Sequence, residues 1–289
     1  MANPFLGLEP RSALRDPATI LHDGVYHCFY TVVEQHEGNY QLFVDVSTSR
    51  DLGLWSKPRR LTQPGLNYSS PGNIIRLANK WFLCLQSYPT KLGNAYGSDD
   101  SRLWLMESED LVSWDEPYLL EPRGCRAKWC KSKRQIDPYL VEHEGKFWCF
   151  YKSDGKLGLL VSSDLKEWEE ASPDAPVLDG AQTPDSSTVE NACAVRDGDE
   201  WVLFFAPCRD GRGIGVARST DLIHWREVRY LDFPALPWAP GGPTAAMVLD
   251  TRVETGCWTM FFHGDRHPPH GAALGWAWSD DLETWHCPE

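Results

Sequence analysis

The stretch Ser219-Thr220-Asp221-Leu222-Ile223-His224-Trp225 contains a pattern, Asp-Leu-x-x-Trp, that occurs five times along the chain. The tryptophans that end the five copies are separated by 54 to 60 residues and are Trp55, Trp114, Trp168, Trp225 and Trp285. A serine lies shortly before the aspartate of every copy. Self-similarity at a period of this size is typical of propellers and solenoids. The sequence is therefore organised as five repeats of one structural unit.

Each repeat has the pattern of β-strands. Short runs rich in Val, Phe, Tyr and Trp, such as residues 25–31 and 42–46, precede each copy and are separated by Gly, Asp and Asn. Apolar residues at helical spacing over a dozen positions do not occur. Four antiparallel strands in each of five repeats predict an all-β fold, a five-bladed β-propeller with a central funnel. Because the repeat runs from end to end, we expect residues 1–289 to form a single domain.

The repeated pattern itself has a structural interpretation. Its serine and aspartate can accept hydrogen bonds from the amides of a turn between two strands, and its tryptophan can pack between neighbouring blades. We therefore interpret the five aspartates as turn residues and not as catalytic groups.

The two ends of the chain predict how the ring closes. Only four residues follow Trp285, so the fifth blade lacks an outer strand. Residues 4–8 precede the first inner strand and have no place in blade one. They are expected either to pair on the open edge of blade five or to lie across a face of the propeller.

Composition excludes several classes of partner. The net charge of −13, with 41 acidic and 28 basic residues, argues against nucleic acid, whose binding needs a basic face. No apolar run approaches the length of a membrane helix, and the N-terminus lacks the basic start and apolar core of an export signal. We therefore expect a cytoplasmic protein that binds neither nucleic acid nor membranes. The acidic balance and the 14 tryptophans favour an uncharged, ring-shaped ligand.

The nine cysteines do not suggest a metal site. Cys28 and Cys149 occupy equivalent places in apolar strands and are expected to be buried free thiols. Cys125 and Cys130 lie five positions apart, with no second pair at the spacing of a zinc site.

Acidic residues also stand where the innermost strands are expected to begin. Asp16 precedes a proline, which favours an extended conformation before it, and Asp137 repeats this arrangement on the third blade. Glu190 stands seven residues before Asp197, as Asp16 stands seven before Asp23. The five positions that we take as equivalent carry Asp16, Pro71, Asp137, Glu190 and Gly242. Buried acids are costly unless they are paired or used, so these three either cap inner-strand amides, hold a central ion or act in catalysis.

Several carboxylates around a narrow pocket suit glycosidic bond cleavage. One acid protonates the leaving oxygen while another activates water, and a third can adjust the pKa of the donor. We predict that Glu190, which has the longest reach, is the proton donor, with Asp16 as the base. Asp137 is expected to keep the pKa of Glu190 raised. An inverting enzyme would hold the carboxyl groups of Asp16 and Glu190 roughly 6.5 to 9.5 Å apart.

At these residues the sequence resembles the five-bladed propeller glycosidases of glycoside hydrolase family 43, and more loosely families 32, 62, 68 and 117. The resemblance is carried by Asp16-Pro17, Ile136-Asp137-Pro138 and Glu190. In family 43 the matching residues are the general base, the pKa modulator and the general acid of an inverting hydrolase. The resemblance implies an exo-acting enzyme on short plant-type oligosaccharides, similar to α-L-arabinofuranosidases or β-xylosidases.

Two departures from the family pattern leave the sugar open. Many members have Trp-Ala-Pro where this chain has Ser70-Pro71-Gly72, and many have Gly-Pro where it has Asn191-Ala192. Two alternatives also remain open. One is a retaining β-fructosidase like family 32, although that family's Asn before the first Asp is here Arg15. The other is a non-catalytic propeller that binds carbohydrate.

The resemblance also bears on ions. Some family members hold a calcium or sodium ion on the propeller axis, and His263 could belong to such a site. The sequence has no ligand cluster of its own, so we predict neither a metal nor a cofactor.

Substrate contacts are expected from segments near the rim of the funnel. Sugar rings stack on tryptophan faces, and arginine can bind hydroxyl groups in pairs. We predict that Trp129, Trp238 and Arg266 contact the sugar. Residues 123–134 form a basic run in an acidic protein, which is either a solvated loop or a lip that touches substrate or tunes a nearby acid.

Overall fold

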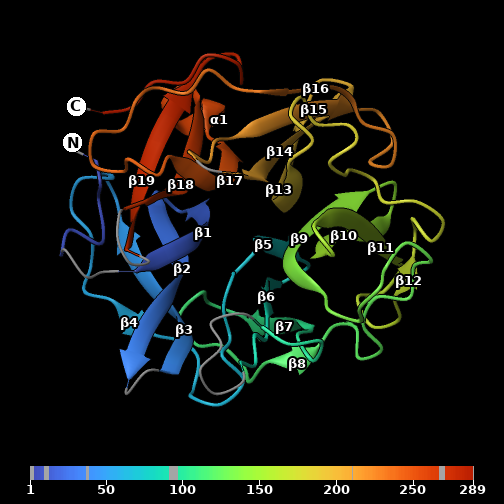
Figure 1. The fold of residues 1–289 in the computed structure, drawn as a ribbon. Coiled ribbons are helices and arrows are strands. Elements are labelled where there is room, and N and C mark those ends of the chain that lie inside the picture. Colours follow the sequence, from blue (N-terminus) through green and yellow to red (C-terminus); the bar gives the residue numbers. More distant parts are fainter. Residues whose placement is uncertain are drawn as a thin grey trace.

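Five antiparallel sheets surround a central axis in the computed structural model, which describes residues 3–9, 13–36, 39–90, 97–209, 211–266 and 271–288 (Figure 1). The arrangement confirms the predicted all-β, five-bladed propeller. No helix in the described part of the chain has the length and apolarity needed to cross a bilayer.

Each blade is built from consecutive strands that run from the axis outward in chain order. Blade one contains β1 (Leu14–His22), β2 (Val25–His36), β3 (Asn39–Ser49) and β4 (Arg59–Arg60). Blade two contains β5 (Ile74–Leu77), β6 (Lys80–Gln86), β7 (Leu103–Ser108) and β8 (Tyr118–Leu119). Blade three contains β9 (Ile136–His143), β10 (Lys146–Ser153), β11 (Lys156–Ser162) and β12 (Glu169–Glu170). Blade four contains β13 (Thr188–Asp197), β14 (Glu200–Cys208), β15 (Gly215–Ser219) and β16 (Arg226–Tyr230). Blade five contains β17 (Pro243–Asp250), β18 (Trp258–Asp265) and β19 (Ala272–Ser279), with the short helix α1 (Arg252–Thr255) between its first two strands.

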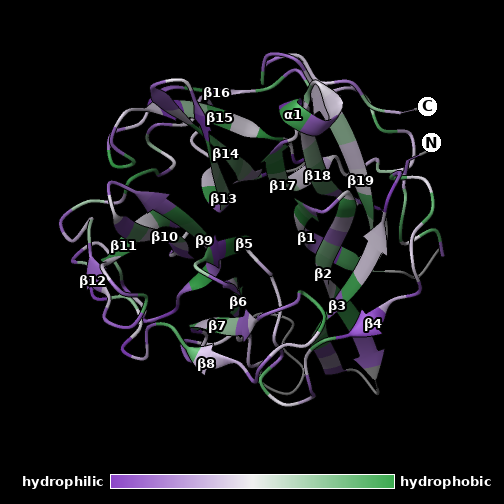
Figure 2. Cartoon of the chain, turned by 180° about the vertical axis from the view of Figure 1, so that it is seen from behind, coloured by the Kyte–Doolittle hydropathy of each residue, from purple (hydrophilic) through white to green (hydrophobic). Residues whose placement is uncertain are grey.

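The core lies between the blades. Phe204 and Phe205 on β14 are both fully buried, as are Phe261 and Phe262 on β18. Adjacent residues of a strand point to opposite faces of its sheet, so burial of both means that each of these blades is covered on both faces. This explains why the middle strands are continuous apolar runs. The outer strands β4 and β12 are short and hydrophilic (Figure 2).

The repeated pattern forms the turn that follows the third strand of each blade. In blade four, Oδ1 of Asp221 accepts hydrogen bonds from the amides of Ile223 (2.9 Å) and His224 (2.8 Å). The Ser219 hydroxyl accepts from the Leu222 amide at 3.1 Å, and the Trp225 indole donates to the Leu222 carbonyl at 3.0 Å. The corresponding indole bonds occur at Trp55, Trp114, Trp168 and Trp285, which confirms that the five tryptophans are equivalent.

We expect Asp281→Ala to lower the free energy of unfolding by about 1 kcal/mol, because its Oδ1 accepts from the amides of Glu283 and Thr284 as a capping residue does. These backbone bonds lower the pKa of Asp281 despite slight burial. Because the pKa of Asp281 is lower in the folded state than the unfolded value of about 3.9, its carboxylate stabilises the folded protein above that pH. This stabilisation is lost as the pH falls below it. The difference from wild type in urea unfolding should therefore shrink as the pH falls below about 4. The neighbouring exposed Asp280→Ala is the control, and an equal loss in both variants would contradict the turn interpretation.

The N-terminal segment completes blade five. The Phe5 amide donates to the Leu274 carbonyl (2.9 Å), and the Leu274 amide donates to the Leu6 carbonyl (3.0 Å). The Asn3 side chain exchanges two hydrogen bonds with the backbone of Trp276. The Phe5 ring also stacks on Trp55 of blade one, with 4.6 Å between ring centroids. Of the two expected arrangements, pairing on the edge of β19 is therefore confirmed.

Deletion of residues 2–8 should lower the melting temperature by several degrees, since it removes the edge pairing on β19 and the Phe5 contact that joins the first and last blades. Differential scanning calorimetry measures this directly. Phe5→Ala in the full chain should produce part of the loss, because the backbone pairing remains. An unchanged melting temperature after the deletion would show that blade five is stable with three strands.

Candidate functional site

A residue with a left-handed backbone lies near or shortly before the start of each innermost strand. These five residues have φ between 40° and 52° and are Asp16, Ser70, Asp137, Asn191 and Ala245. In β1, β9, β13 and β17 the pairing with the next strand also shifts register near this residue. A shift of this kind is a β-bulge, which redirects a side chain at the end of a sheet. The five left-handed residues are therefore the structurally equivalent positions.

This geometry corrects the equivalence expected from the sequence on three blades. Ser70 takes the place expected for Pro71, Asn191 that of Glu190, and Ala245 replaces Gly242 in the same way. In blade four the following turn begins at Gly198, one residue later than counting to Asp197 assumed. Glu190 consequently matches Arg15 of blade one, because each precedes the left-handed residue.

The three predicted carboxylates nevertheless meet in one pocket. Asp16, Asp137 and Glu190 come from β1, β9 and β13 and line a cavity of about 780 Å³. Sites for small ligands have volumes of roughly 300 to 1,000 Å³, so the pocket has room for a short oligosaccharide. The distance between the carboxyl groups of Asp16 and Glu190 stays a prediction.

Asp16 is held rigidly by blades one, two and five. Its Oδ2 accepts hydrogen bonds from the hydroxyls of Ser70 (3.0 Å) and Thr31 (3.2 Å). Its amide donates to Nδ1 of His263 at 3.1 Å, so this nitrogen carries no proton. Burial lowers the pKa of His263 well below its usual range and keeps the ring neutral. Burial also raises the pKa of Asp16, although the positive charge of Arg15 opposes this.

Glu190 is ion-paired with two cations. Lys152 of β10 donates to its Oε2, and Arg212 donates to its Oε1 at 2.7 Å. Arg212 also donates to Asp265 at 3.1 Å. Burial alone would raise the pKa of Glu190, but the charges of Lys152 and Arg212 outweigh it and lower the pKa to about 2. The predicted raised pKa of Glu190 is therefore wrong for the site without a ligand.

Asp137 instead has the most raised pKa of the three carboxyl groups. Burial, helped by the negative charges of Glu190 and Asp16, raises its pKa to about 7, although Lys152 opposes the rise. The Asp137 amide donates to the Gln86 side chain at 2.7 Å, which positions the start of β9. Near neutral pH the carboxyl group of Asp137 is therefore partly protonated.

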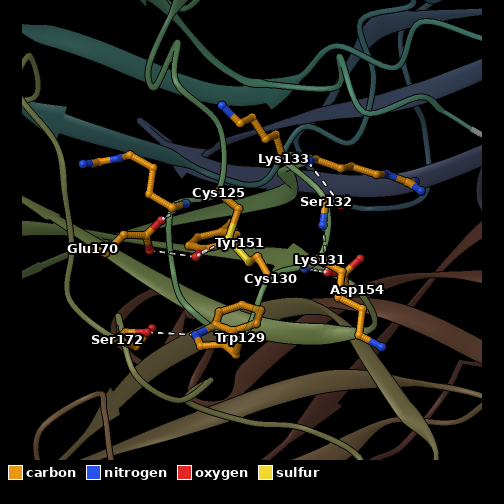
Figure 3. Close-up of a disulfide and its surroundings, with 12 residues drawn as sticks. Cys125, Trp129, Cys130, Lys131, Ser132, Lys133, Tyr151, Asp154, Glu170 and Ser172 are labelled. Atoms are coloured by element: carbon orange, nitrogen blue, oxygen red, sulfur yellow. Dashed lines mark hydrogen bonds between the residues drawn. A yellow bond between two sulfur atoms is a disulfide. The ribbon is translucent and has the colours of Figure 1, made fainter.

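Of the three residues predicted to contact substrate, one lines the pocket and two pack within the protein. Arg266 lines the pocket and donates to the backbone carbonyl of Gly7 at 2.8 Å. Trp129 stacks on Tyr151 and donates to the Ser172 carbonyl at 2.9 Å (Figure 3). Trp238 stacks on Phe262. Neither Trp129 nor Trp238 belongs to the described lining of the pocket. Because both indoles pack against blades, their contact with a sugar stays a prediction.

The basic run near the rim is a loop closed by a disulfide that the sequence analysis did not predict. Cys125 and Cys130 are bonded beside Tyr151, whose hydroxyl donates to Glu170 at 2.7 Å (Figure 3).

Cys28 and Cys149 are buried free thiols, as expected. Persistent disulfides are typical of oxidising compartments, whereas the N-terminal sequence predicts the cytoplasm. The location stays a prediction.

A second, small cavity of about 20 Å³ lies beneath Asp16 and Asp137 and is also lined by Tyr139. It has room for about one water molecule. In the described ranges, His, Cys, Asp and Glu form no group of three or more that could hold a metal.

Sequence reasoning missed the cations that control the acids. Lys152 follows Tyr151 at the end of β10, where blade one has Thr31 after Tyr30. An alignment of Thr31 with Lys152 in the two repeats would have placed this lysine beside the start of β9, where it pairs with Ile136. Arg212 lies in a loop between β14 and β15 and has no such signal.

Comparison with known proteins supports the fold. No family model matches the sequence, and no curated protein matches it. A thermostable family 43 glycoside hydrolase superposes with a TM-score of 0.67 at 14% identity, covering 100% of this chain and 96% of the other. An exo-1,5-α-L-arabinanase from a bovine ruminal metagenomic library gives 0.68 at 16% identity, with coverage of 96% and 97%. An α-L-arabinofuranosidase from Podospora anserina, in complex with cellotriose, gives 0.70 at 13% identity, with coverage of 95% and 94%. The chain therefore shares the propeller fold of these glycosidases.

Direct titration should identify Asp137 as the protonated carboxyl group. With ¹³C-labelled aspartate and glutamate side chains, NMR should detect one carboxyl that titrates near pH 7, and Asp137→Asn should remove it. Lys152→Met should move the pKa of Glu190 upward, because it removes a positive charge that stabilises the carboxylate. Asp280→Asn should leave both titrations unchanged. A titration near pH 7 that persists in Asp137→Asn would contradict the charge assignment.

Proposed function

We propose that this chain is a glycoside hydrolase that cleaves glycosidic bonds of short plant-type oligosaccharides. The observation that carries the proposal is the meeting of Asp16, Asp137 and Glu190, from three blades, in one pocket of about 780 Å³. The shared fold with solved glycosidases supports it. The named activities of two of those proteins favour an exo-acting, α-L-arabinofuranosidase-like enzyme, with a β-xylosidase-like enzyme as the related option.

In the proposed inverting reaction Asp16 is the general base. It takes a proton from a water molecule whose oxygen bonds to the anomeric carbon, while the bond to the leaving oxygen breaks. The hydroxyls of Ser70 and Thr31 orient the Asp16 carboxylate for this step. The leaving oxygen receives a proton from Glu190.

Glu190 must be protonated before it can act as the acid. In the ligand-free site Lys152 and Arg212 keep it ionised, whereas the pKa of Asp137 is raised to about 7. A sugar bound between Glu190 and these cations would remove their stabilising effect, and burial would then raise the pKa of Glu190. We assign to Asp137, whose pKa is also affected by the charge of Lys152, the role of modulating the protonation of Glu190.

A second candidate is a non-catalytic propeller that binds carbohydrate. The double ion pair of Glu190 favours it, because a carboxylate held by two cations is also what a purely structural residue would show. This candidate predicts binding of sugars without release of reducing ends.

A screen of nitrophenyl glycosides, with arabinofuranosides and xylosides first, tests the proposal. We expect release of nitrophenol by wild type and, for a substrate with a poor leaving group, a loss in kcat of about 10²-fold or more in Glu190→Gln, since general acid catalysis contributes about that much. Asp280→Asn, on the outer turn, is the matched control. NMR of the first product should show inverted anomeric configuration.

Each other outcome has a defined meaning. Retained configuration would replace the inverting mechanism by the β-fructosidase-like alternative, in which Asp16 is the nucleophile. Binding of sugars with no hydrolysis by any glycoside would favour the binding propeller. Hydrolysis that is unaffected by Glu190→Gln would remove Glu190 from the mechanism.

A further inference from the structure

The lining of the pocket has the opposite charge balance to the protein as a whole. The chain carries a net charge of −13. The described residues around the pocket nevertheless include four acids, Asp16, Asp137, Glu190 and Asp265, and six bases: Arg15, Arg134, Lys152, Arg209, Arg212 and Arg266. Asp137 is partly protonated near neutral pH, which increases the surplus of positive charge. An uncharged sugar does not require such a surplus.

Three of these bases are already paired with acids. Lys152 and Arg212 bind Glu190, and Arg212 also binds Asp265. Arg209 pairs with Asp185, which lies outside the described lining. Their charges are compensated within the protein and are not available to a ligand without rearrangement.

Arg134 and Arg266 are held in place by uncharged partners. Arg134 donates to the hydroxyl of Tyr88 at 2.9 Å and stacks over its ring, 5.0 Å from the centroid. Arg266 donates to the backbone carbonyls of Gly7 and Glu9. Among the residues that the structure describes, neither arginine has a carboxylate within ion-pair distance. Both arginines therefore line the pocket without an ion pair to any carboxylate of the described residues.

Arg134 also belongs to the basic loop of residues 123–134, in which three other basic residues form ion pairs away from the pocket. Arg123 and Arg126 bind the buried carboxylate of Glu121, and Lys128 pairs with Asp174. Arg134 is the residue of this loop that lines the pocket in the described structure. Arg134 lines the same pocket as Asp137 and precedes it by three residues in the sequence, and its positive charge opposes the rise in the pKa of Asp137.

Resting on the proposed function, we propose that the substrate is an anionic glycan and that Arg134 binds its negative group beside the reactive carboxyls. The chemistry that suits a guanidinium is a carboxylate or another oxyanion bound by two parallel N–H groups. A uronic acid residue supplies a carboxylate and a sulfated sugar supplies a sulfate ester. Arg266, which follows the end of β18, adds a second positive charge to the lining.

Matched monosaccharides test this without turnover. We would measure Kd by ligand-observed NMR for D-galactose against D-galacturonic acid, for D-glucose against D-glucuronic acid, and for D-galactose 6-sulfate. A hydrogen bond to a charged group corresponds to about a tenfold gain in affinity or more. We therefore expect at least one acid sugar to bind about tenfold more tightly than its neutral counterpart, with a preference that falls as salt rises.

The variants assign that preference to one residue. Arg134→Gln should reduce the acid sugar to the affinity of the neutral one, whereas Arg134→Lys should retain part of the preference because it keeps the charge without the planar fork. Lys133→Gln removes the same charge from the exposed neighbouring residue and should retain the full preference. A tighter fit for the sulfated sugar than for either uronic acid would identify the anion as a sulfate ester.

The proposal is overturned if neither acid nor sulfated sugar binds more tightly than its neutral counterpart, or if the preference survives Arg134→Gln. These results are independent of catalysis. Arg134-dependent binding with no hydrolysis of any glycoside would remove the proposed enzyme and leave the anion site. Hydrolysis of neutral glycosides that depends on Glu190, with no preference for acid sugars, would leave the enzyme and remove the anion site.

Discussion

The left-handed residue near the start of each innermost strand is the constraint on which both fold and site depend. A left-handed backbone at a residue other than glycine costs on the order of 1–3 kcal/mol. It recurs at five equivalent residues because the five inner strands must bend where they crowd the axis. The crowding is evident at Gly72, where an added Cβ would lie 1.6 Å from the carbonyl oxygen of Pro138. Two of the five bends carry Asp16 and Asp137, so the feature that closes the propeller also brings two carboxylates to the funnel.

Burial of three acids in one pocket is possible because each has a different form of compensation. Asp16 accepts hydrogen bonds from neutral hydroxyls, Glu190 is paired with two cations, and Asp137 has a raised pKa, so that it is partly protonated near neutral pH. Lys152 links the last two, because its charge stabilises both carboxylates while its hydrogen bond goes to Glu190. Removal of one partner from a buried ion pair leaves an uncompensated charge and is strongly unfavourable. Ligand binding between Glu190 and its cations must therefore supply replacement contacts, which a polar or charged sugar can do.

Much of this structure was predictable because the repeat is local in sequence. The Asp-Leu-x-x-Trp turns and the number of blades follow from patterns a few residues long, and the structure confirms them. The pairing of the N-terminal segment was one of two arrangements that the sequence left open. Register was less predictable, since an error of one residue in blade four exchanged Glu190 for Asn191 at the bend. The partners of Glu190 were not predictable in this way. Lys152 and Arg212 lie 38 and 22 residues from it in sequence, and only the circular arrangement of blades brings them together.

The net charge of the chain also does not predict the charge around the pocket. Net charge is a sum over the whole chain, whereas a pocket is lined by only a few side chains. The exposed turns hold many of the acids, and among them Asp51, Asp110 and Asp164 bind backbone amides there. Charges on the outer turns are screened within about 8–10 Å at physiological salt, so they do not offset an arginine that faces a partly enclosed cavity. The ligand therefore meets the local balance around Arg134 and Asp137, and that balance is set by which residues the bends and loops of the five blades bring to the axis.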